Sequence, residues 1–349
     1  MSIDAFLKNP VWLAPLAGVA DAPFRQLCKE QGAGLTCTEM ISAKGLHFNP
    51  EGSGSERLLR LSPGETPAVV QLFGADAAIM AGQAARVAER LGADLALIDV
   101  NMGCPVQKVV KRGEGSALMK TPDGAAAIVA AMVAALAPSG VALSVKMRVG
   151  YEAGEDIAVD FALRLQEAGA ALVTVHGRTR AQFYHGTSDD EAVARVAEAL
   201  EIPVFASGDI LTAQRAVQML DRTPVAGVMV ARGAIGHPWI FRQVAQLRAG
   251  SAQAPEPTIA ERFALIRRHV CLTQECYADS RASRLRKHLI AYAAGLPGAT
   301  RFRARVNAAD TFDAIATLLD DYESWLLGMR QGDGSLVSCA RKSKGFESV

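Results

Sequence analysis

The sequence predicts an α/β protein, a (β/α)8 barrel of the TIM type followed by a small C-terminal helical domain. Eight short aliphatic runs alternate with helical patterns over residues 11–230. Polar residues follow nearly every run, and strand-like runs stop after Trp239. Strict alternation of strands and helices is typical of a parallel barrel, in which the chemistry collects at the carboxyl ends of the strands.

The predicted strands are short and rich in aliphatic or β-branched residues. They cover residues 11–14, 35–38, 68–72, 95–100, 142–147, 171–175, 203–206 and 227–230. Helix signals lie between them, at residues 21–32, 76–92, 123–137, 156–169, 189–200 and 212–220. A doubly wound sheet is the alternative, but the first strand ends in "APLAGVADAPF" and not in the GxGxxG turn that such sheets use for dinucleotides.

The chain divides where the pattern changes. We predict a barrel domain over residues 1–245 and a helical domain over 255–330, because "GSAQAPEPT" (250–258) has the composition of a linker. The polar residues 331–349 are predicted to be a disordered tail.

Composition excludes several classes of protein. A formal net charge of +1 over 349 residues excludes a globally basic nucleic-acid binder but allows a local basic patch. The six cysteines are irregularly spaced without a CxxC pair, so we expect neither a disulfide framework nor a metal site. No export signal is visible at the N-terminus, and the most apolar stretch, 125–137, is too short to span a bilayer. We expect a cytoplasmic monomer that binds no membrane.

The strand ends carry the candidate site. In chain order they offer Pro15, Glu39, Gln71, Asn101 with Cys104, Lys146, His176 with Arg178, then "SGD" (207–209) and "ARG" (231–233). Lys146 places a full charge inside the strand-like run "VALSVKMRV", and a buried ammonium needs an anion. That anion is either a carboxylate on a neighbouring strand or an electron-rich cofactor ring.

The last two strand ends have the form of a phosphate site. Gly208 and Arg232 follow the seventh and eighth strands, where barrels of this type commonly bind phosphate through backbone N–H groups. Glycine is common in any strand-to-helix turn, so the two positions count only together. His176 is either a structural histidine or part of an anion-facing rim. Gln71 fits the edge of a flavin or base ring as well as an ordinary loop hydrogen bond.

Cys104 stands in the turn "NMGCPVQK" (101–108), directly after a predicted strand. It is either a packed hydrophobe or a positioned acid or nucleophile. Gly103 is expected to allow a sharp turn and Pro105 to stiffen it.

These residues resemble a known family. The segments "APLAGVADAPFR", "VQLFG", "IDVNMGCPVQKVVKRGEGSALM", "VKMRVG", "VTVHGRTR", "ASGDI", "ARGAIGHPWIF" and "RKHLIAYAAGLPGATRFRARVN" are similar to the tRNA-dihydrouridine synthases, most nearly the bacterial DusB type. The resemblance covers about residues 11–325. It implies an FMN-bound barrel that uses NADPH to reduce the C5=C6 bond of uridine in tRNA.

The resemblance also implies roles for single residues. It assigns FMN contacts to Pro15, Leu16, Ala17, Gln71, Lys146, His176, Ser207, Gly208, Asp209, Ala231 and Arg232. Asn101 would hold the uracil and Cys104 would protonate it. The sequence departs from the family where Leu16, Ser207 and Ala231 replace the usual Met, Asn and Gly.

A uridine inside a folded tRNA must be extruded before it reaches a barrel mouth, and this requires a grip on the RNA backbone. Residues 281–305 contain no acid and seven cations, namely Arg281, Arg284, Arg286, Lys287, Arg301, Arg303 and Arg305, and Lys108, Lys111 and Arg112 follow the cysteine turn. A solvated helix face is the plainer interpretation, but the lack of a compensating carboxylate favours a phosphate-binding track. We therefore predict that Arg178, Arg286 and Lys287 contact the substrate.

Two other functions share part of this pattern. An FMN barrel that reduces free pyrimidines would use Lys146 and the phosphate loops but has no use for a basic helical domain. An RNA-binding or folding-assistant protein without catalysis would not need Asn101, Cys104 and Lys146 intact.

Overall fold

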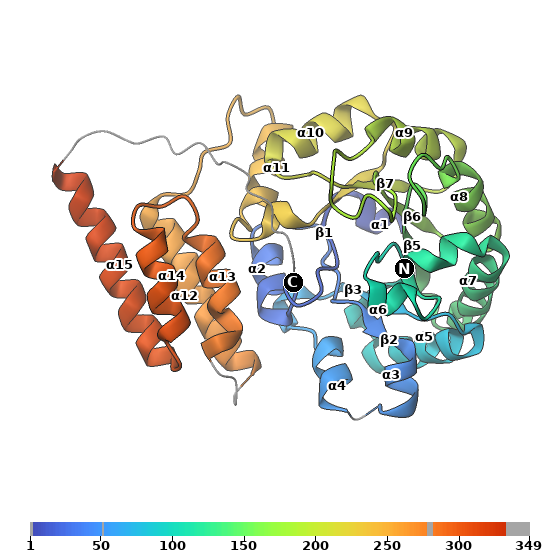
Figure 1. Cartoon of the computed structure of the whole chain (residues 1–349), viewed down its shortest axis with the longest axis horizontal. Helices are drawn as coiled ribbons and strands as arrows, with labels where there is room; N and C mark the ends of the chain where they lie inside the picture. The colour runs from blue at the N-terminus through green and yellow to red at the C-terminus, as the bar shows by residue number, and fades with distance from the viewer. Residues whose placement is uncertain (1–2, 51, 278–281, 333–349) are drawn as a thin grey trace. The chain divides into compact units, whose positions relative to one another are not determined.

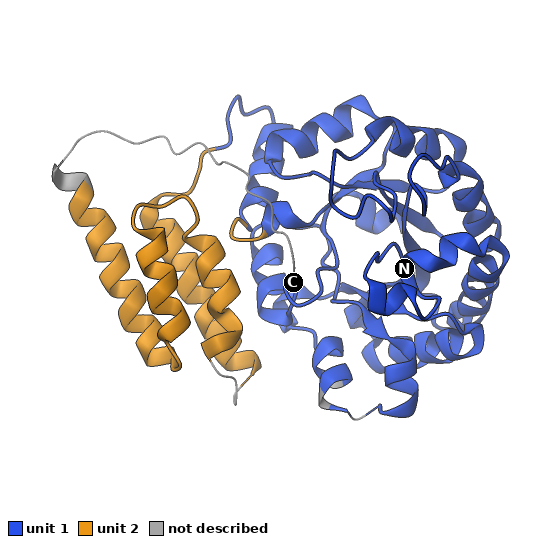
Figure 2. Cartoon of the chain, viewed as in Figure 1, with its two compact units in different colours: residues 1–234, 238–254 blue, residues 235–237, 255–349 orange. Residues whose placement is uncertain are grey.

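The computed structural model describes residues 3–50, 52–277 and 282–332. The chain forms two compact units, residues 1–234 with 238–254 and residues 235–237 with 255–349 (Figure 2).

The first unit is built on an eight-stranded parallel sheet with the strand order β1-β8-β7-β6-β5-β4-β3-β2. The strands are β1 (Val11–Leu13), β2 (Ile41–Ser42), β3 (Ala68–Phe73), β4 (Leu95–Met102), β5 (Ala142–Arg148), β6 (Leu172–His176), β7 (Val204–Ser207) and β8 (Gly227–Val230). The sheet curls with helices outside it (Figure 1), so the predicted fold class is confirmed.

Residues 35–38, predicted as the second strand, close the curled sheet. They form isolated bridges and not a full strand; the structure's β2 follows at 41–42. The Leu13 N–H donates to the Leu35 carbonyl at 2.9 Å, and the Val69 N–H donates to the Thr36 carbonyl at 2.8 Å. These bonds join β1 to β3, so this short segment closes the barrel.

Among the described residues, four of the seven outer helices begin at a residue whose side chain caps the helix. The seven are α2 (Ala22–Glu30), α5 (Ala77–Leu91), α7 (Pro122–Leu136), α8 (Ala158–Glu167), α9 (Asp190–Ala199), α10 (Ala213–Arg222) and α11 (Ile240–Arg248). The side chains of Asp21, Asp76, Asp189 and Thr212 each accept a backbone N–H three residues later, which satisfies a donor that the first helical turn leaves open. Short helices that the pattern did not predict are α1 (Asp4–Leu7), α3 (Ala43–Phe48), α4 (Ser53–Leu59) and α6 (Gln107–Val110).

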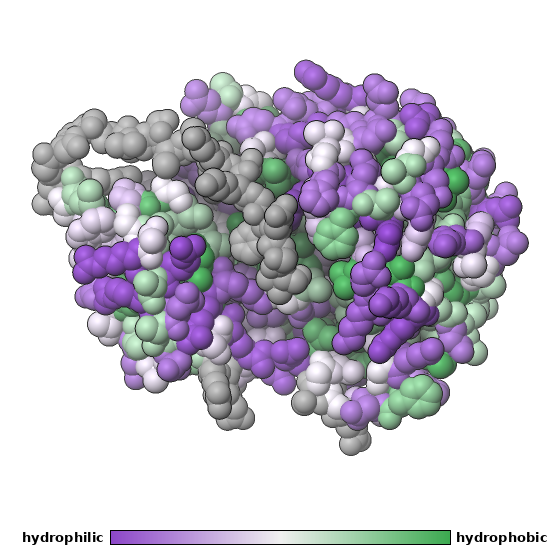
Figure 3. Space-filling view, in the orientation of Figure 1, coloured by the Kyte–Doolittle hydropathy of each residue, from purple (hydrophilic) through white to green (hydrophobic). Residues whose placement is uncertain are grey.

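Helix α7 is apolar enough, by length and composition alone, to be a candidate membrane span among the described residues. Its buried positions, which include Ile128, Val129 and Met132, belong to the same hydrophobic cluster as the barrel strands. Helices α9 and α10 are amphipathic, and their outer faces form part of the hydrophilic surface in Figure 3. Helix α7 is therefore one wall element of the barrel.

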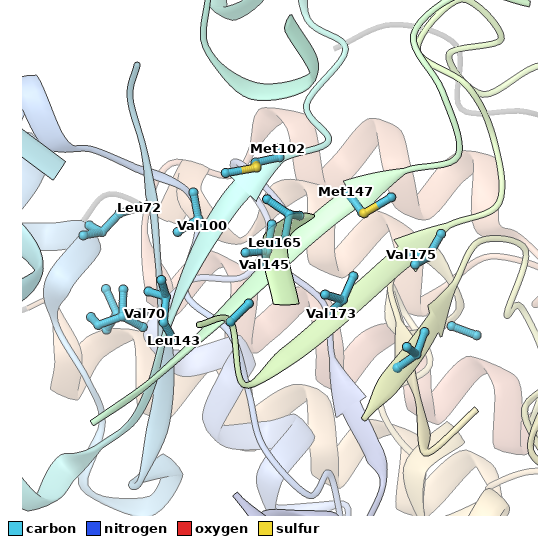
Figure 4. Packing of buried hydrophobic residues seen from close by; sticks show 14 of the residues in the cluster. Val70, Leu72, Val100, Met102, Leu143, Val145, Met147, Leu165, Val173 and Val175 are labelled. Atoms are coloured by element: carbon cyan, nitrogen blue, oxygen red, sulfur yellow. The ribbon is translucent and has the colours of Figure 1, made fainter. Parts of the chain in front are cut away.

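Side chains of the strands alternate between two hydrophobic clusters. Val70, Val100, Val145 and Val173 point toward the helices and pack in one cluster with Leu165 of α8 (Figure 4). The residues between them point into the barrel, where a second cluster contains Trp12, Val69, Leu97, Leu172, Phe205 and Met229. This alternation decides which strand residues line the mouth.

The second unit is helical. Its helices are α12 (Ile259–Cys276), α13 (Arg286–Tyr292), α14 (Ala299–Ala308) and α15 (Phe312–Gly332). Thr258 and Glu261 form a capping box that starts α12. The rings of Phe302 and Tyr322 stack with centroids 4.4 Å apart, which joins α14 to α15. Residues 331 and 332 of the predicted tail belong to α15, and residues 333–349 lie outside the described part of the chain.

Candidate active site

The inward-pointing positions bring the predicted residues of neighbouring strands together. Alternation from Leu97 puts Asp99 and Asn101 inside the barrel, and alternation from Leu172 puts Thr174 and His176 inside. The strand register sets Asn101 beside Lys146, Lys146 beside Thr174, and His176 beside Ser207. Side chains that are far apart in the sequence therefore share one mouth.

A chain of hydrogen bonds runs across this mouth from Asp99 to the cysteine turn. Gln71 Nε2 donates to Asp99 Oδ2 at 2.7 Å, and Asn101 Nδ2 donates to Gln71 Oε1 at 2.8 Å. Asn101 Oδ1 then accepts the backbone N–H groups of Gly103 at 3.2 Å and Cys104 at 2.9 Å. Because a carboxylate only accepts, Asp99 fixes the orientation of both amides.

Asp99 is a site residue that the sequence reasoning missed. Its side chain is fully buried and also accepts the Ser144 hydroxyl at 2.6 Å. Burial raises the pKa of Asp99, while the hydrogen bonds from Gln71 and Ser144 and the charge of Lys146 act against the rise. The available signal was an acid inside the otherwise apolar run "LALIDV".

Asn101, predicted to hold the uracil, also binds the backbone of the cysteine turn. Its carbonyl oxygen is occupied by the turn that carries Cys104, and its Nδ2 lies 3.8 Å from the sulfur of Met40. The amide both orients the turn and keeps Nδ2 at the mouth.

The cysteine turn is also held from the opposite side. The Cys104 carbonyl accepts the Ser116 N–H at 3.1 Å and the Ser116 hydroxyl at 2.8 Å. Gly115 has a φ of +63°, and a Cβ on it would lie 3.1 Å from the Cβ of Cys104. Gly103 was predicted to allow a sharp turn; its backbone is not left-handed, so its φ angle does not require glycine. There a Cβ would lie 3.4 Å from the Lys146 carbonyl, so Gly103 meets an ordinary packing contact and not a conformational demand.

Cys104 is half-buried and free of any disulfide. Burial raises the pKa of its thiol, and the Val106 N–H and the charge of Arg148 act in the opposite direction. The thiol is therefore protonated at neutral pH, as a proton donor must be.

Lys146 carries an unbalanced charge. Burial and the nearby Arg148 lower its pKa to about 8, and Asp99 opposes this shift. Within the described residues its ammonium makes no ion pair or hydrogen bond, although Asp99 lies on the adjacent strand. The salt-bridge interpretation is therefore not met by a contact, and the charge remains available to a ligand.

His176 is neutral at the mouth. Burial lowers its pKa well below the usual value, and the surrounding cations Lys146, Arg148, Arg178 and Arg232 lower it further. Its Nδ1 accepts the Arg178 N–H at 3.2 Å, which leaves the ring proton on Nε2 as a donor.

The loop after β7 is organised by one aspartate in a left-handed conformation. Asp209 has a φ of +49° and follows Gly208, whose φ is +114°. The two terminal guanidinium nitrogens of Arg178 donate to the Asp209 carboxylate at 2.9 and 2.7 Å, and Arg232 donates to the same carboxylate at 3.1 Å. Burial would raise the pKa of Asp209, but Arg178, the Ser188 N–H and Arg232 lower it.

Arg178, predicted to contact the substrate, lies beneath this loop. Its side chain is 2% exposed and also donates to the carbonyls of His185 at 3.0 Å and Gly186 at 2.6 Å. Arg178 therefore connects the loop after β6 to the loop after β7 through its ion pair with Asp209. Arg232 is less buried and keeps part of its guanidinium at the surface.

The loops after β1 and β8 carry further residues predicted to contact the cofactor. Pro15 and Leu16 are half-buried, and Ala17 is exposed. The Glu39 carboxylate accepts the Gly18 N–H, which gives this otherwise unassigned acid a role in shaping the loop. Ala231 leads into a short 3₁₀ turn, Arg232–Ala234.

The inner mouth has polar atoms that the protein leaves unsatisfied. The hydroxyls of Thr174 and Ser188 are buried without a hydrogen-bond partner in the described structure. A Cβ on Gly208 would lie 2.3 Å from the Ser188 hydroxyl, and one on Gly233 would lie 2.3 Å from the Ile210 carbonyl. The two glycines therefore let neighbouring loops pack closely. The two unsatisfied hydroxyls and the ammonium of Lys146 fit an anionic, polar ligand such as a flavin phosphate ester.

The basic run of the helical unit is partly neutralised by acids outside it. Arg286 pairs with Asp310 at 2.8 Å and Arg305 pairs with Asp321 at 2.6 Å, so the expected lack of a compensating carboxylate was wrong. The reason is that α14 and α15 bring later acids back to the run. The cations that stay exposed without an ion pair among the described residues are Arg284, Lys287, Arg301 and Arg303; Arg281 lies outside them.

Comparison with known proteins agrees with this architecture. A solved histamine dehydrogenase from Rhizobium sp. 4-9 shares the fold with a TM-score of 0.53 at 12% identity, over 92% of this chain and 62% of that chain. The tRNA-dihydrouridine synthase B of Pseudomonas aeruginosa is 37% identical over 95% of this chain and 97% of its own length. That of Xanthomonas campestris is 40% identical over 92% and 95%.

The family model "Dihydrouridine synthase (Dus)" matches residues 12–323, a range that contains the carboxyl end of every strand of the sheet. The matched range, together with relatives at 36–40% identity over most of their length, leads to one conclusion. This chain belongs to the dihydrouridine synthase family.

Proposed function

We propose that this protein reduces the C5=C6 bond of specific uridines in tRNA to 5,6-dihydrouridine, with FMN as cofactor and NADPH as reductant. The observation that carries the proposal is the Cys104 thiol, kept protonated by burial and held after β4 by Asn101, which pairs in register with Lys146 and its unpaired ammonium. Membership of the family supports the reaction class.

The residues present fit FMN. The backbone of residues 207–209 and 231–232 would receive the phosphate, with Arg232 beside it. Gln71, Lys146 and His176 would meet the ring system, and Pro15, Leu16 and Ala17 would lie along it. When bound and reduced by NADPH, FMN supplies the hydride that adds to C6 of the uracil.

The protein supplies the proton and the charge. Cys104 gives the proton to C5, so that hydride and proton together saturate the double bond. The thiolate that remains is stabilised by the Val106 N–H and the charge of Arg148 until it takes a proton from solvent. The Lys146 ammonium stabilises negative charge on the reduced ring, and Asn101 Nδ2 meets a uracil carbonyl.

The exposed cations of both units support tRNA as the partner. The target nucleotide leaves its stack to enter the mouth, while Lys108, Lys111 and Arg112 contact phosphates beside it. The helical unit over residues 255–330 binds the rest of the tRNA through its exposed cations. A reducing, cytoplasmic setting keeps the Cys104 thiol free for this role.

The cysteine assignment is tested with C104A and C104S proteins on unmodified tRNA. Both variants should retain FMN, seen as a yellow protein that releases the flavin on denaturation. Dihydrouridine formation, measured by mass spectrometry of the tRNA, should fall by about 10²–10⁴ because the acid is absent. An undiminished yield in C104A would remove the proton-donor role, and a colourless protein that cannot be reconstituted would remove the cofactor. Reduction of free uracil at a comparable kcat/KM would contradict the tRNA assignment.

A further inference from the structure

Arg148 ends β5, two residues after Lys146, on the same inward-pointing series. Its side chain is almost fully buried at 3% exposure. A buried guanidinium is costly unless its donors are satisfied, so its partners indicate what it does.

The donors of Arg148 go to two loops. Nε donates to the Gly103 carbonyl at 2.8 Å, inside the cysteine turn. Nη1 donates to the Thr179 carbonyl at 2.8 Å and to the Phe183 carbonyl at 2.9 Å, both in the loop after β6. All three acceptors are main-chain carbonyls, so these hydrogen bonds depend on the path of the loops and not on their side chains.

The Phe183 end of this contact is a strained backbone. Phe183 has a φ of +53°, a conformation that a side chain as large as phenylalanine rarely adopts. The Arg148 guanidinium also lies 5.7 Å from the centroid of the Tyr184 ring. Arg148 therefore binds the loop after β6 at a residue whose backbone is strained.

The hydrogen bond from Arg148 to the cysteine turn is not duplicated by the other side chains that bind the turn, because they bind different backbone atoms. Asn101 binds the N–H groups of Gly103 and Cys104, and Ser116 binds the carbonyl of Cys104. The carbonyl of Gly103 is the group that Arg148 takes. Together the three side chains fix the peptide groups on both sides of the cysteine.

We propose that Arg148 is a positioning residue for Cys104, tying the cysteine turn to the loop after β6 so that the thiol is held in one place. The proposal rests on the proposed function only for the meaning of Cys104, since the tie itself is a property of the fold. A lysine at this position would keep the charge but would lack the planar fork that reaches both loops at once.

The charge of Arg148 acts on the pKa of the Cys104 thiol, so the contact between them can be tested by titrating the thiol. The groups that face Arg148 are the Cys104 thiol, the Tyr184 phenol and the cations Lys146, Arg178 and His176 when protonated. Burial and Arg178 lower the pKa of Arg148 to about 10, so it stays charged at neutral pH, and its charge lowers the pKa of Cys104.

The test compares R148Q, R148K and the control R164Q in flavin-loaded protein. Arg164 lies on the exposed side of α8 and pairs with Asp123. The rate of Cys104 alkylation by iodoacetamide is followed against pH and read from the Cys104 peptide by mass spectrometry, which separates it from Cys271 and Cys276. The kcat and KM for dihydrouridine formation are measured on the same preparations.

We expect R148Q to shift the alkylation midpoint to higher pH, because the charge that lowers the thiol pKa is gone. R148K should leave the midpoint near that of the wild type, yet kcat should fall in both variants by roughly tenfold to a hundredfold, because the thiol is no longer aimed. KM for tRNA should change less than kcat, and R164Q should match the wild type throughout.

An alkylation profile in R148Q that is unchanged or shifted to lower pH would overturn the proposal, as would wild-type kcat in R148K. If R148Q does not retain flavin, R148K alone decides: a reduced kcat at normal flavin content supports the tie, and a normal kcat refutes it. The alkylation profile needs no turnover. A wild-type protein that makes no dihydrouridine would therefore refute the proposed function, while the profile would still report whether the charge of Arg148 acts on the Cys104 thiol.

Discussion

The Lys146 ammonium has no ion-pair partner among the described residues. Its pKa of about 8 lies below the usual value of 10.5, because burial and Arg148 disfavour the ammonium in the native state. The unfolded chain therefore holds this proton to a higher pH than the native chain. By proton linkage, the contribution of Lys146 to the stability of the cofactor-free protein rises from about pH 8 to about pH 10.5 and is least favourable below pH 8.

This titration predicts how flavin binding depends on pH. An anionic ligand at the mouth stabilises the ammonium, so FMN affinity should be constant up to about pH 8 and should then fall, by up to about tenfold per pH unit if only the charged form binds. The measurement is quenching of flavin fluorescence by cofactor-free protein from pH 7 to pH 9.5. K146M should bind more weakly and lose this dependence, while K146R should keep affinity to higher pH. Equal slopes in the wild type and K146M would show that another group controls binding.

At the scale of elements, strand alternation made much of the site predictable. Gln71, Asn101, Lys146, His176 and Ser207 occupy inward positions at strand ends, as the run of polar residues in the sequence indicated. The contacts between loops were not predictable, because their partners are far apart in the chain. Arg148 and Gly103 are 45 residues apart.

The same limit explains the predictions that differed from the structure. Arg178 was predicted to lie at the rim of the mouth, but in the structure it pairs with Asp209. Arg286 was predicted to have no acidic partner, but Asp310, between α14 and α15, pairs with it. In both cases the charge of a residue is visible in the sequence, but the partner that folding supplies is not. The loop "HFNPEGSGSER" contributes to α3 and α4, which are too short for a periodic pattern to indicate.

The interior of the barrel provides an element-scale prediction at Gly227, the first residue of β8. A Cβ there would lie 2.3 Å from the Phe205 ring, which packs against Trp12 with centroids 4.4 Å apart. G227A should lower the free energy of unfolding by about 1–3 kcal/mol, since the ring has little room to move. G82A, at an exposed position of α5 with open space, should instead raise it by about 0.5–1 kcal/mol.

Urea unfolding of the flavin-loaded protein, followed by tryptophan fluorescence, measures both changes. If G227A were as stable as the wild type, the inner cluster would tolerate a shifted Phe205 ring and would not be the tightly packed core inferred here. A loss of stability in G82A would show that the helix, and not the added methyl group, decides the outcome at such positions.

At the scale of the whole molecule, a net charge of +1 conceals a local separation of charge. In the helical unit, three of the four acids of α15 are engaged with arginines: Asp320 and Glu323 with Arg267, and Asp321 with Arg305. Lys287 of α13 and Arg301 and Arg303 of α14 are exposed and have no ion pair among the described residues. A surface whose acids are already paired presents net positive charge to a polyanion even when the chain is balanced.

The double variant K287E/R303E tests this surface, and R305Q is the matched control because its charge is already offset by Asp321. K287E/R303E should raise the apparent KM for tRNA while leaving NADPH oxidation without tRNA unchanged. The slope of log affinity against log salt should become shallower by about 0.7–0.9 for each phosphate that the variant no longer neutralises, and R305Q should change it much less. Filter binding of unmodified tRNA from 50 to about 200 mM salt spans the range in which such interactions weaken. Wild-type affinity and slope in K287E/R303E would mean that the tRNA is held by the barrel rim, where Lys108, Lys111 and Arg112 would then bind the phosphates.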